Sequence, residues 1–261
     1  MERGLWLCVG CRRQVSVTSG TLFQDSRIPL TLWFRAMWHV TSQKNGMSAL
    51  GLQRVLGLGS YKSAWSLLHK LRRAMVRPGR ERLSGVVEVD ETCWGTREKG
   101  ALGRFTEDKA LIIVAAEAEG NGIGRIRLRR IPDVARATLH GFIMQSVETG
   151  STIRTDGLYA YLDMQGYVHD RQVQRKQPED VHLLPRVHRV MSLFKRWLMG
   201  THQGAISHKH LDGYLDEFTF RFNRRTSASR GKLFYRLVQQ AVQVDPAPYA
   251  PAIKTQHLVG G

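Results

Sequence analysis

Acidic side chains are scarce in this 261-residue chain. Asp and Glu number 22 against 39 Lys and Arg, so the formal charge is +17 at pH 7. That shortage excludes an acidic buffer protein and an ordinary metabolic enzyme, and it favours a polyanionic partner, with nucleic acid ahead of an anionic membrane. The sequence also lacks internal repeats and low-complexity tracts. Since 42% of its residues are hydrophobic, the composition predicts a packed core and excludes a disordered basic tail.

Cysteines are few as well. The chain has three, an odd number, which argues against a disulfide framework and fits a reducing compartment such as the cytoplasm. No apolar run reaches the length of about eighteen residues that would suggest a membrane span. The first residues, Met1 to Val9, carry no apolar segment followed by a cleavage site, so no secretion signal is expected.

The positive charge is concentrated in the N-terminal third. Residues 1–85 hold 14 basic and 3 acidic residues, a net charge of +11, whereas residues 86–261 hold 25 and 19. Pro78 and Gly79, a pair that ends a helix and opens a linker, mark the boundary. We predict a knuckle region over 1–20, a helical domain over 21–77, an α/β domain over 78–240 and a flexible, proline-rich tail over 241–261.

Cys8 and Cys11 form a C-x-x-C pair that leads into a predicted strand, as in one half of a zinc ribbon. A structural zinc site needs four ligands, normally from two such pairs, and Cys93 is far away on another predicted element. The two cysteines are therefore either free thiols or the remnant of a zinc ribbon whose first knuckle has been lost or lies upstream of Met1. Zn²⁺ is expected only if that missing knuckle is supplied.

Residues 29–76 show apolar spacing typical of helices. The first helix starts at Pro29, the second covers 48–56, and the third follows a glycine-containing turn with Ser60 as its N-cap. This order is a helix-turn-helix pattern. An ordinary three-helix bundle with a solvated basic face is the alternative, but the charge of the region favours DNA binding. The side chains expected to face phosphates are Lys62, Lys70, Arg72 and Arg73.

Two aspartates end neighbouring strands of the predicted α/β domain. The first strand covers 85–92, and Glu88 and Asp90 lie on one face of it because side chains alternate. Strands over 109–116 and 124–131 form a hairpin, a helix runs from Asp133, its expected cap, to Val147, and a fourth strand over 151–157 lies parallel to the first. Asp90 and Asp156 then meet at the sheet edge where α/β proteins bind ligands.

A helix over 183–200 carries His188, Ser192 and Lys195 as one stripe beside its buried face. Acids on two strands, faced by a helix that carries a further ligand, are typical of a two-metal phosphoryl-transfer site, in which two divalent cations stabilise the attacking and leaving oxygens.

The sequence resembles the ISXO2-like insertion-sequence transposases, which are DDE-type recombinases. The resemblance covers nearly the whole chain. The motifs that carry it are Val86–Thr92, Thr155–Gly157, Val187–Trp197, Gly200–Gly204 and Tyr214–Arg225. The last of these is the longest and the most specific. It implies an α/β fold with an RNase H-like catalytic domain, preceded by the small helical, helix-turn-helix-like domain and the partial zinc-ribbon knuckle.

By position, the resemblance implies that Asp90 and Asp156 are the first two catalytic carboxylates and metal ligands. The third acid of a DDE site falls at His188, a departure from the usual Glu, with Lys195 seven residues later as a contact to the DNA end. Imidazole suits Mn²⁺ better than Mg²⁺. Glu217 is the alternative third acid, with an i, i+4 ion pair to Arg221 as its structural interpretation. Arg221, Arg224 and Arg225 are interpreted either as backbone contacts to DNA or as ordinary surface charge.

The expected function is therefore that of a DNA transposase. It would bind terminal inverted repeats and target DNA, use Mg²⁺ or Mn²⁺ to cut the 3′ ends of a mobile element, and join them to the target as a homo-oligomer. The expected location is the bacterial cytoplasm, at the nucleoid when DNA is bound. Two alternatives are a catalytically inactive DNA-binding remnant and an RNase H-like nuclease with another role.

Overall fold

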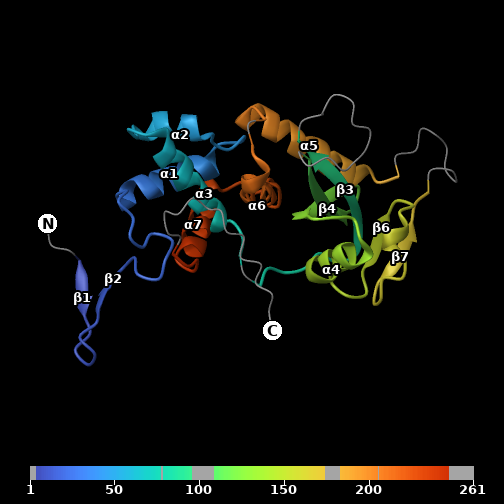
Figure 1. The fold of residues 1–261 in the computed structure, drawn as a ribbon, viewed down its shortest axis with the longest axis horizontal. Coiled ribbons are helices and arrows are strands. Elements are labelled where there is room, and N and C mark those ends of the chain that lie inside the picture. Colours follow the sequence, from blue (N-terminus) through green and yellow to red (C-terminus); the bar gives the residue numbers. More distant parts are fainter. Residues whose placement is uncertain (1–3, 78, 96–108, 174–182, 205, 247–261) are drawn as a thin grey trace. The chain divides into compact units, whose positions relative to one another are not determined.

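A computed structural model describes residues 4–77, 79–95, 109–173, 183–204 and 206–246 (Figure 1). The chain divides into two compact units. The first unit comprises Met1–Pro78 together with Ser227–Gly261, and the second comprises Gly79–Thr226. Within the described residues, no helix has both the length and the apolar character that crossing a membrane requires.

The first unit begins with a small antiparallel hairpin and continues in helices. The hairpin strands are β1 (Leu5–Leu7) and β2 (Gln14–Ser16). Helices α1 (Leu30–Ser42), α2 (Ala49–Leu56) and α3 (Tyr61–Arg73) follow, over the ranges that the apolar spacing predicts. Ser48 and Ser60 cap α2 and α3, because their hydroxyl oxygens accept from the backbone N–H groups of Gly51 and Lys62.

The last helix, α7 (Arg230–Ala241), also belongs to the first unit, although the sequence analysis assigned residues up to 240 to the α/β domain. Its apolar side chains need a partner surface, and α1 supplies one. The ring of Phe234 lies 6.5 Å from that of Phe34 and 6.0 Å from that of Trp38, centroid to centroid. The chain thus leaves the first unit, builds the second and returns.

The second unit is built on a mixed five-stranded sheet in the order β5-β4-β3-β6-β7. Its strands are β3 (Val86–Trp94), β4 (Ala110–Glu119), β5 (Gly122–Ile131), β6 (Thr152–Thr155) and β7 (Val168–Arg171). β3, β4 and β5 form an antiparallel meander, and β6 and β7 run parallel to β3. The predicted hairpin and the predicted parallel strand are both present. β7 was not predicted, because it is short and partly exposed.

Helices cover both faces of this sheet. α4 (Arg136–Ser146) packs on one face, and α5 (Pro185–His202) and α6 (Leu211–Phe222) pack on the other (Figure 1). A short 3₁₀ turn, η3 (His208–His210), precedes α6. α4 begins three residues after the expected cap, with Ala135 at the N-cap position. Asp133 accepts hydrogen bonds from Ala135 N, just before the helix, and from Thr138 Oγ1, in its first turn.

Strand alternation separates two cores. Val87 and Val89 of β3 lie in the core beneath α4, whereas Ile112 and Val114 of β4 lie in the core beneath α5 and α6. The helix predicted over 183–200 buries one apolar stripe in this core; its members are Leu184, just before α5, and Val187, Met191, Phe194 and Leu198 within it. Of the polar side chains of β3 that face α5, Glu88 is fully buried and Asp90 is partly exposed.

Candidate active site

Glu88 is a carboxylate with no solvent exposure, directed at the first turn of α5. Its Oε2 accepts from the backbone N–H groups of Arg186 at 2.7 Å and Val187 at 3.0 Å, and its Oε1 accepts from Nη1 of Arg186 at 2.9 Å. The N-cap residue of α5, Leu184, offers no side-chain acceptor. A strand carboxylate thus takes the place of the cap, and its negative charge faces the positive end of the helix dipole.

The side chain of Arg186 extends this anchor to the next hairpin. Its Nε and Nη2 donate to the backbone carbonyls of Gly122 and Gly120, each at 2.9 Å, at the turn between β4 and β5. The start of α5 is therefore attached to two places on the sheet. This fixes both the position and the rotation of the helix before its next residues pass over β3.

His188 is the first of those residues to meet the sheet. Its Nε2 lies 3.0 Å from Oδ2 of Asp90, which stands two residues beyond Glu88 on the same face of β3. The His188 side chain is 51% exposed and that of Asp90 is 15% exposed. The pair lies where the covered layer opens to solvent, with the carboxylate inside and the imidazole at the rim.

Asp156 stands beside Asp90 at the end of the neighbouring strand. β3 and β6 pair in parallel, with Val86 opposite Thr152 and Glu88 opposite Arg154. Continuing that register by two residues brings Asp90 level with Asp156, and adjacent strands lie only about 4.8 Å apart. Oδ1 of Asp156 accepts from the backbone N–H of Leu158 at 2.9 Å, which holds the carboxylate at the strand end.

The charges of this cluster act on one another. Burial raises the pKa of Asp90 above its usual value, and the negative charge of Asp156 raises it further; the backbone N–H of Glu91 and the imidazole of His188 oppose the rise. Two carboxylates that repel each other in a partly dry site are poised to take up a cation or a proton.

Four residues near the cluster were not predicted as site residues: Tyr161, Glu91, Thr155 and His169. The hydroxyl of Tyr161, a fully buried side chain, donates to Glu91, and burial followed by the charges of Glu91, Asp90 and Asp156 raises the Tyr161 pKa well above its usual value. Thr155 Oγ1 donates to the backbone carbonyl of Asp156 and lies 2.8 Å from Nε2 of His169. The sequence held one sign of this second contact. Because side chains alternate along a strand, Glu91 must point to the face of β3 opposite to that of Asp90, where a buried carboxylate needs a donor.

The two candidates for the third ligand are placed differently. His188 contacts Asp90, whereas Glu217 is a buried residue of α6 whose Oε1 accepts from Nε of Arg221 at 3.1 Å. The charges that shift the pKa of Asp90 come from Asp156 and His188. His188 thus lies against Asp90, and Glu217 forms an ion pair with Arg221 of its own helix. Lys195, half-buried, lies two turns further along α5.

The arginines that follow Glu217 make contacts within the second unit. The guanidinium of Arg224 stacks 4.1 Å above the Phe220 ring, and that of Arg225 lies 4.1 Å above the Phe222 ring. Arg225 also donates to the backbone carbonyls of Gly124 and Ile123 in β5. These contacts attach the end of α6 to the β4–β5 hairpin, and they favour a structural contribution from Arg225.

In the first unit, Lys62 and Arg73 are exposed on α3 and Lys70 is half-exposed. Burial and then the charge of Arg73 lower the pKa of Lys70. Arg72 is 1% exposed, and its Nη1 lies 3.1 Å from Nε2 of His69. Three of the four predicted side chains on this helix are thus available to an outside partner.

The second unit is an α/β domain with two carboxylates at the ends of adjacent parallel strands. Residues 82–223, more than half of the chain, match the family described as the ISXO2-like transposase domain. The chain belongs to this family of transposases from insertion sequences.

Two individual proteins are also similar to this chain. The chain is 26% identical over 237 residues to an "Uncharacterized protein in transposable element ISH50" of Halobacterium salinarum (strain ATCC 700922 / JCM 11081 / NRC-1), a match that spans 83% of this chain and 77% of the relative. Among solved structures, the catalytic core domain of BIV integrase covers 60% of this chain and 97% of its own, at 14% identity and a TM-score of 0.37.

The family implies a divalent cation, and the residues present fit one. Asp90 and Asp156 offer carboxylate oxygens on a shared face, which suits a hard cation such as Mg²⁺, and their mutual repulsion would be relieved by its charge. Within the described part of the chain, no three His, Cys, Asp or Glu side chains are already gathered as a ligand cluster. The fit to a cation thus depends on the two carboxylates, and His188 lies beside them through its contact with Asp90.

Glu88→Gln tests the anchor of α5. The amide keeps the shape but brings an N–H₂ group against backbone donors and leaves Arg186 without its carboxylate, so the expected loss of unfolding free energy is about 3 kcal/mol. Hydrogen exchange should show the amides of Arg186 and Val187 losing protection. The matched control is Glu119→Gln, an exposed glutamate at the end of β4. Unchanged protection at α5 in Glu88→Gln would contradict the anchor.

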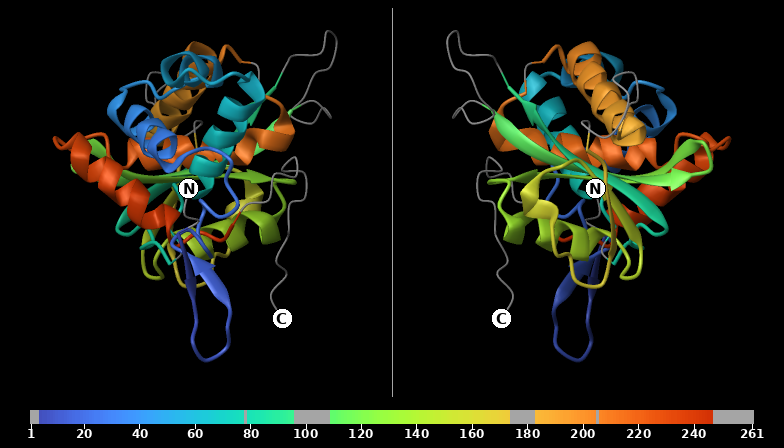
Figure 2. Two further views of the ribbon diagram at one scale, coloured as in Figure 1. Left: turned by 90° about the vertical axis from the view of Figure 1, so that its left-hand side faces the viewer. Right: turned by 90° about the vertical axis from the view of Figure 1, so that its right-hand side faces the viewer.

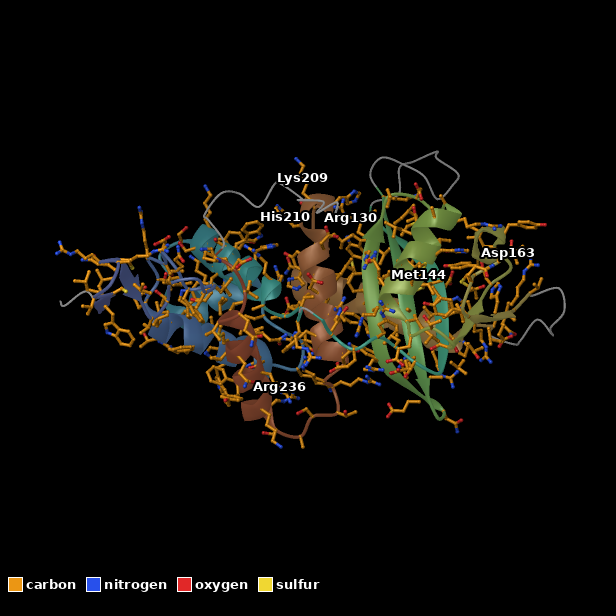
Figure 3. The ribbon with its side chains drawn as sticks, turned by 90° about the horizontal axis from the view of Figure 1, so that it is seen from below. Arg130, Met144, Asp163, Lys209, His210 and Arg236 are labelled. Carbon is orange, nitrogen blue, oxygen red and sulfur yellow. The ribbon has the colours of Figure 1, made fainter. Side chains whose placement is uncertain are left out.

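Asp90→Asn should stabilise the protein at neutral pH without divalent cations. Because the folded pKa of Asp90 is raised above its unfolded value, ionisation weakens the fold; the penalty is absent below the unfolded pKa and develops as pH rises through the folded pKa. The Tm of Asp90→Asn, measured in EDTA, should exceed that of the wild type at pH 7, and the gap should close towards acid pH. The control Asp163→Asn, at an exposed position (Figure 3), should show no such gap. A lower Tm for Asp90→Asn at pH 7 would count against a desolvated carboxylate.

Proposed function

We propose that this transposase cuts the 3′ ends of an insertion sequence and joins them to target DNA at a site formed by Asp90, Asp156 and His188 on an RNase H-like domain. The observation that carries the proposal is the placement of two carboxylates, level with each other on neighbouring parallel strands, with the imidazole of α5 on one of them. Two carboxylates that repel each other at a sheet edge support a cation-dependent role for this site.

Asp90 and Asp156 would hold the divalent cation, and a bound cation supplies electrostatic stabilisation of the attacking and leaving oxygens in an in-line displacement. The protein residues supply the rest. Glu88 positions α5, so that the His188 imidazole keeps the Asp90 carboxylate in place at the rim of the site. Lys195, on the same helix, would contact a DNA phosphate. In the first step water would attack the phosphodiester at the end of the element, and the bond to the 3′-oxygen would break to free a 3′-hydroxyl. In the second step that hydroxyl would attack a phosphodiester of the target DNA, forming the new linkage as the target's own 3′-oxygen leaves.

The first unit would bind the terminal inverted repeats through α2 and α3. Lys62, Lys70 and Arg73 present positive charge on α3, and Gly57, with φ of 65°, makes the tight turn between the two helices. Two ends of one element must be held together for transposition, so we propose a homo-oligomer on DNA. Arg221 and Arg224 are proposed as further contacts to the DNA backbone.

The active-site assignment is tested by cleavage and joining of a labelled terminal repeat with Mg²⁺ or Mn²⁺. Asp90→Asn and Asp156→Asn should each lose at least about 100-fold in rate, because the cation supplies several kcal/mol to the barrier. His188→Ala should lose about 10–100-fold, as removal of a ligand-supporting group does. Glu217→Gln, checked for folding by circular dichroism, should keep cleavage, and so should the surface control Asp163→Asn.

Three results would contradict parts of this assignment. Cleavage that survives Asp90→Asn or Asp156→Asn would remove the carboxylate site. Cleavage lost in a folded Glu217→Gln protein but kept in His188→Ala would assign the third position of the site to Glu217 instead of His188. Binding of the repeat without cleavage under either cation would favour a DNA-binding remnant of a transposase.

The DNA contact of α3 is tested by the salt dependence of repeat binding. Lys62→Ala combined with Arg73→Ala should lower the slope of log K against log[salt] by about 2, since each phosphate contact contributes about 0.9. The control Lys209→Ala removes an exposed lysine of η3, whose side chain extends away from the ribbon in Figure 3. An unchanged slope in the double variant would place the phosphate contacts on another part of the chain.

A further inference from the structure

The chain beyond β6 passes from Asp156 into a short 3₁₀ turn, η1 (Tyr159–Tyr161). Two hydrogen bonds connect the turn to the strand end. The backbone N–H of Leu158 donates to Oδ1 of Asp156 at 2.9 Å, and the N–H of Tyr161 donates to the carbonyl of Leu158 at 3.2 Å. The backbone position of Tyr161 is therefore tied to the carboxylate of Asp156.

Two further sets of contacts hold the same turn. Nη2 of Arg171, at the end of β7, donates to the carbonyl of Gly157 at 2.7 Å. Leu158 and Tyr161 pack into the apolar core on the α4 side of the sheet, where Tyr161 has no solvent exposure. The direction of the Tyr161 side chain is thus set by both its backbone and its packing.

The hydroxyl of Tyr161 connects this turn to β3. It donates to Oε1 of Glu91, and the backbone N–H of Glu91 donates to Oδ1 of Asp90 at 2.8 Å. The side chains of Glu91 and Asp90 point to opposite faces of the sheet. Figure 2 shows these faces covered by α4 (yellow-green) and α5 (orange). A contact on the α4 face therefore acts, through the backbone of β3, on a carboxylate on the α5 face.

The two carboxylates are joined by one continuous series of hydrogen bonds, called here the carboxylate path. It starts at Asp156, passes through Leu158, Tyr161 and Glu91, and ends at Asp90. Since every link is a hydrogen bond within the second unit, a shift at one end is resisted at the other.

The sheet itself does not provide this connection. The ladder between β3 and β6 ends at Glu88 and Arg154, two residues before the carboxylates. Asp90 and Asp156 lie beyond it and repel each other, so rotation of either side chain away from the other would lower the energy. The carboxylate path opposes that rotation at the point where the ladder has ended.

Packing alone would not require a hydroxyl on this side chain. A phenylalanine would fill the same apolar space, and a fully buried hydroxyl costs free energy unless it donates. Burial, and then the negative charges of Glu91, Asp90 and Asp156, raise the pKa of Tyr161 well above its usual value. The hydroxyl therefore keeps its proton and remains a donor to Glu91.

We propose that Tyr161 is a positioning residue of the candidate active site, whose hydroxyl fixes the separation and orientation of Asp90 and Asp156 through Glu91. This inference rests on the proposed function, because its purpose is to present two carboxylates to a cation. Removing a group that orients metal ligands typically weakens cation affinity or activity by about 10–100-fold. Tyr161 acts through its neighbours and not on the DNA.

The first test is Mn²⁺ binding to the DNA-free full chain, followed by the electron paramagnetic resonance signal of free Mn²⁺. Tyr161→Phe should raise the dissociation constant for Mn²⁺ about 10-fold, because it removes the hydroxyl and keeps the ring in the core. The matched control is Tyr167→Phe. Tyr167 packs against the same core, and its hydroxyl donates to the carbonyl of Val147 at 3.1 Å, outside the carboxylate path. This control should bind Mn²⁺ as the wild type does, although it also loses a hydrogen bond.

The second test is hydrogen exchange of the cation-free protein, which does not depend on Mn²⁺ binding. The amides of Glu91 and Leu158 donate within the carboxylate path. They should exchange about 10-fold faster in Tyr161→Phe than in the wild type, as expected for the loss of one buried hydrogen bond. Tyr167→Phe should leave both rates unchanged.

Two results would overturn the positioning role. The first is Mn²⁺ binding that is lost in Asp90→Asn but is as tight in Tyr161→Phe as in the wild type. The second is unchanged exchange of the Glu91 and Leu158 amides in Tyr161→Phe. A wild type that binds no more Mn²⁺ than Asp90→Asn would instead contradict the cation site of the proposed function, and the exchange rates alone would then decide whether Tyr161 positions the carboxylates.

Discussion

The buried contact between Glu88 and the first turn of α5 is the constraint on which the arrangement of the second unit depends. A carboxylate with no exposure to solvent is tolerable only when donors surround it, and here two helix N–H groups and a guanidinium do so. Since β3 repeats every two residues and α5 every 3.6, fixing one point of contact determines which later residues meet. Asp90 and His188, each a short step beyond that point, are brought together.

The same anchor explains how the fold tolerates carboxylates that repel each other. Asp90 loses favourable hydration by its burial and is further disfavoured by Asp156, so the sheet edge is locally unstable in its ionised form. The apolar layers on both faces of the sheet and the attachment of Arg186 to the β4–β5 turn hold the strands in register in spite of it. Packing in the rest of the second unit thus offsets the repulsion between the two carboxylates and keeps them side by side, where a cation can bind.

Much of this could be predicted from the sequence. Alternation along 85–92 predicted the shared face of Glu88 and Asp90, the crossover rule predicted the parallel strand that carries Asp156, and helical spacing predicted the buried face of α5. What Glu88 contacts could not be predicted, because its donors are backbone groups almost a hundred residues away in the chain. The return of α7 to the first unit was missed for a related reason: an amphipathic helix shows that it needs an apolar surface, but not which surface supplies it. Tyr161 escaped because nothing local distinguishes a tyrosine that is buried under carboxylates from one in a loop.

The position of α7 in the sequence also constrains the order in which the two units can fold during synthesis. The ribosome delivers all of Gly79–Thr226 before it delivers the helix that α1 packs against. Domains fold as units during synthesis, so the α/β unit can close while the first unit still waits for its last helix. The first unit, which carries the larger positive charge, therefore cannot complete its fold until the whole of the second unit has been synthesised.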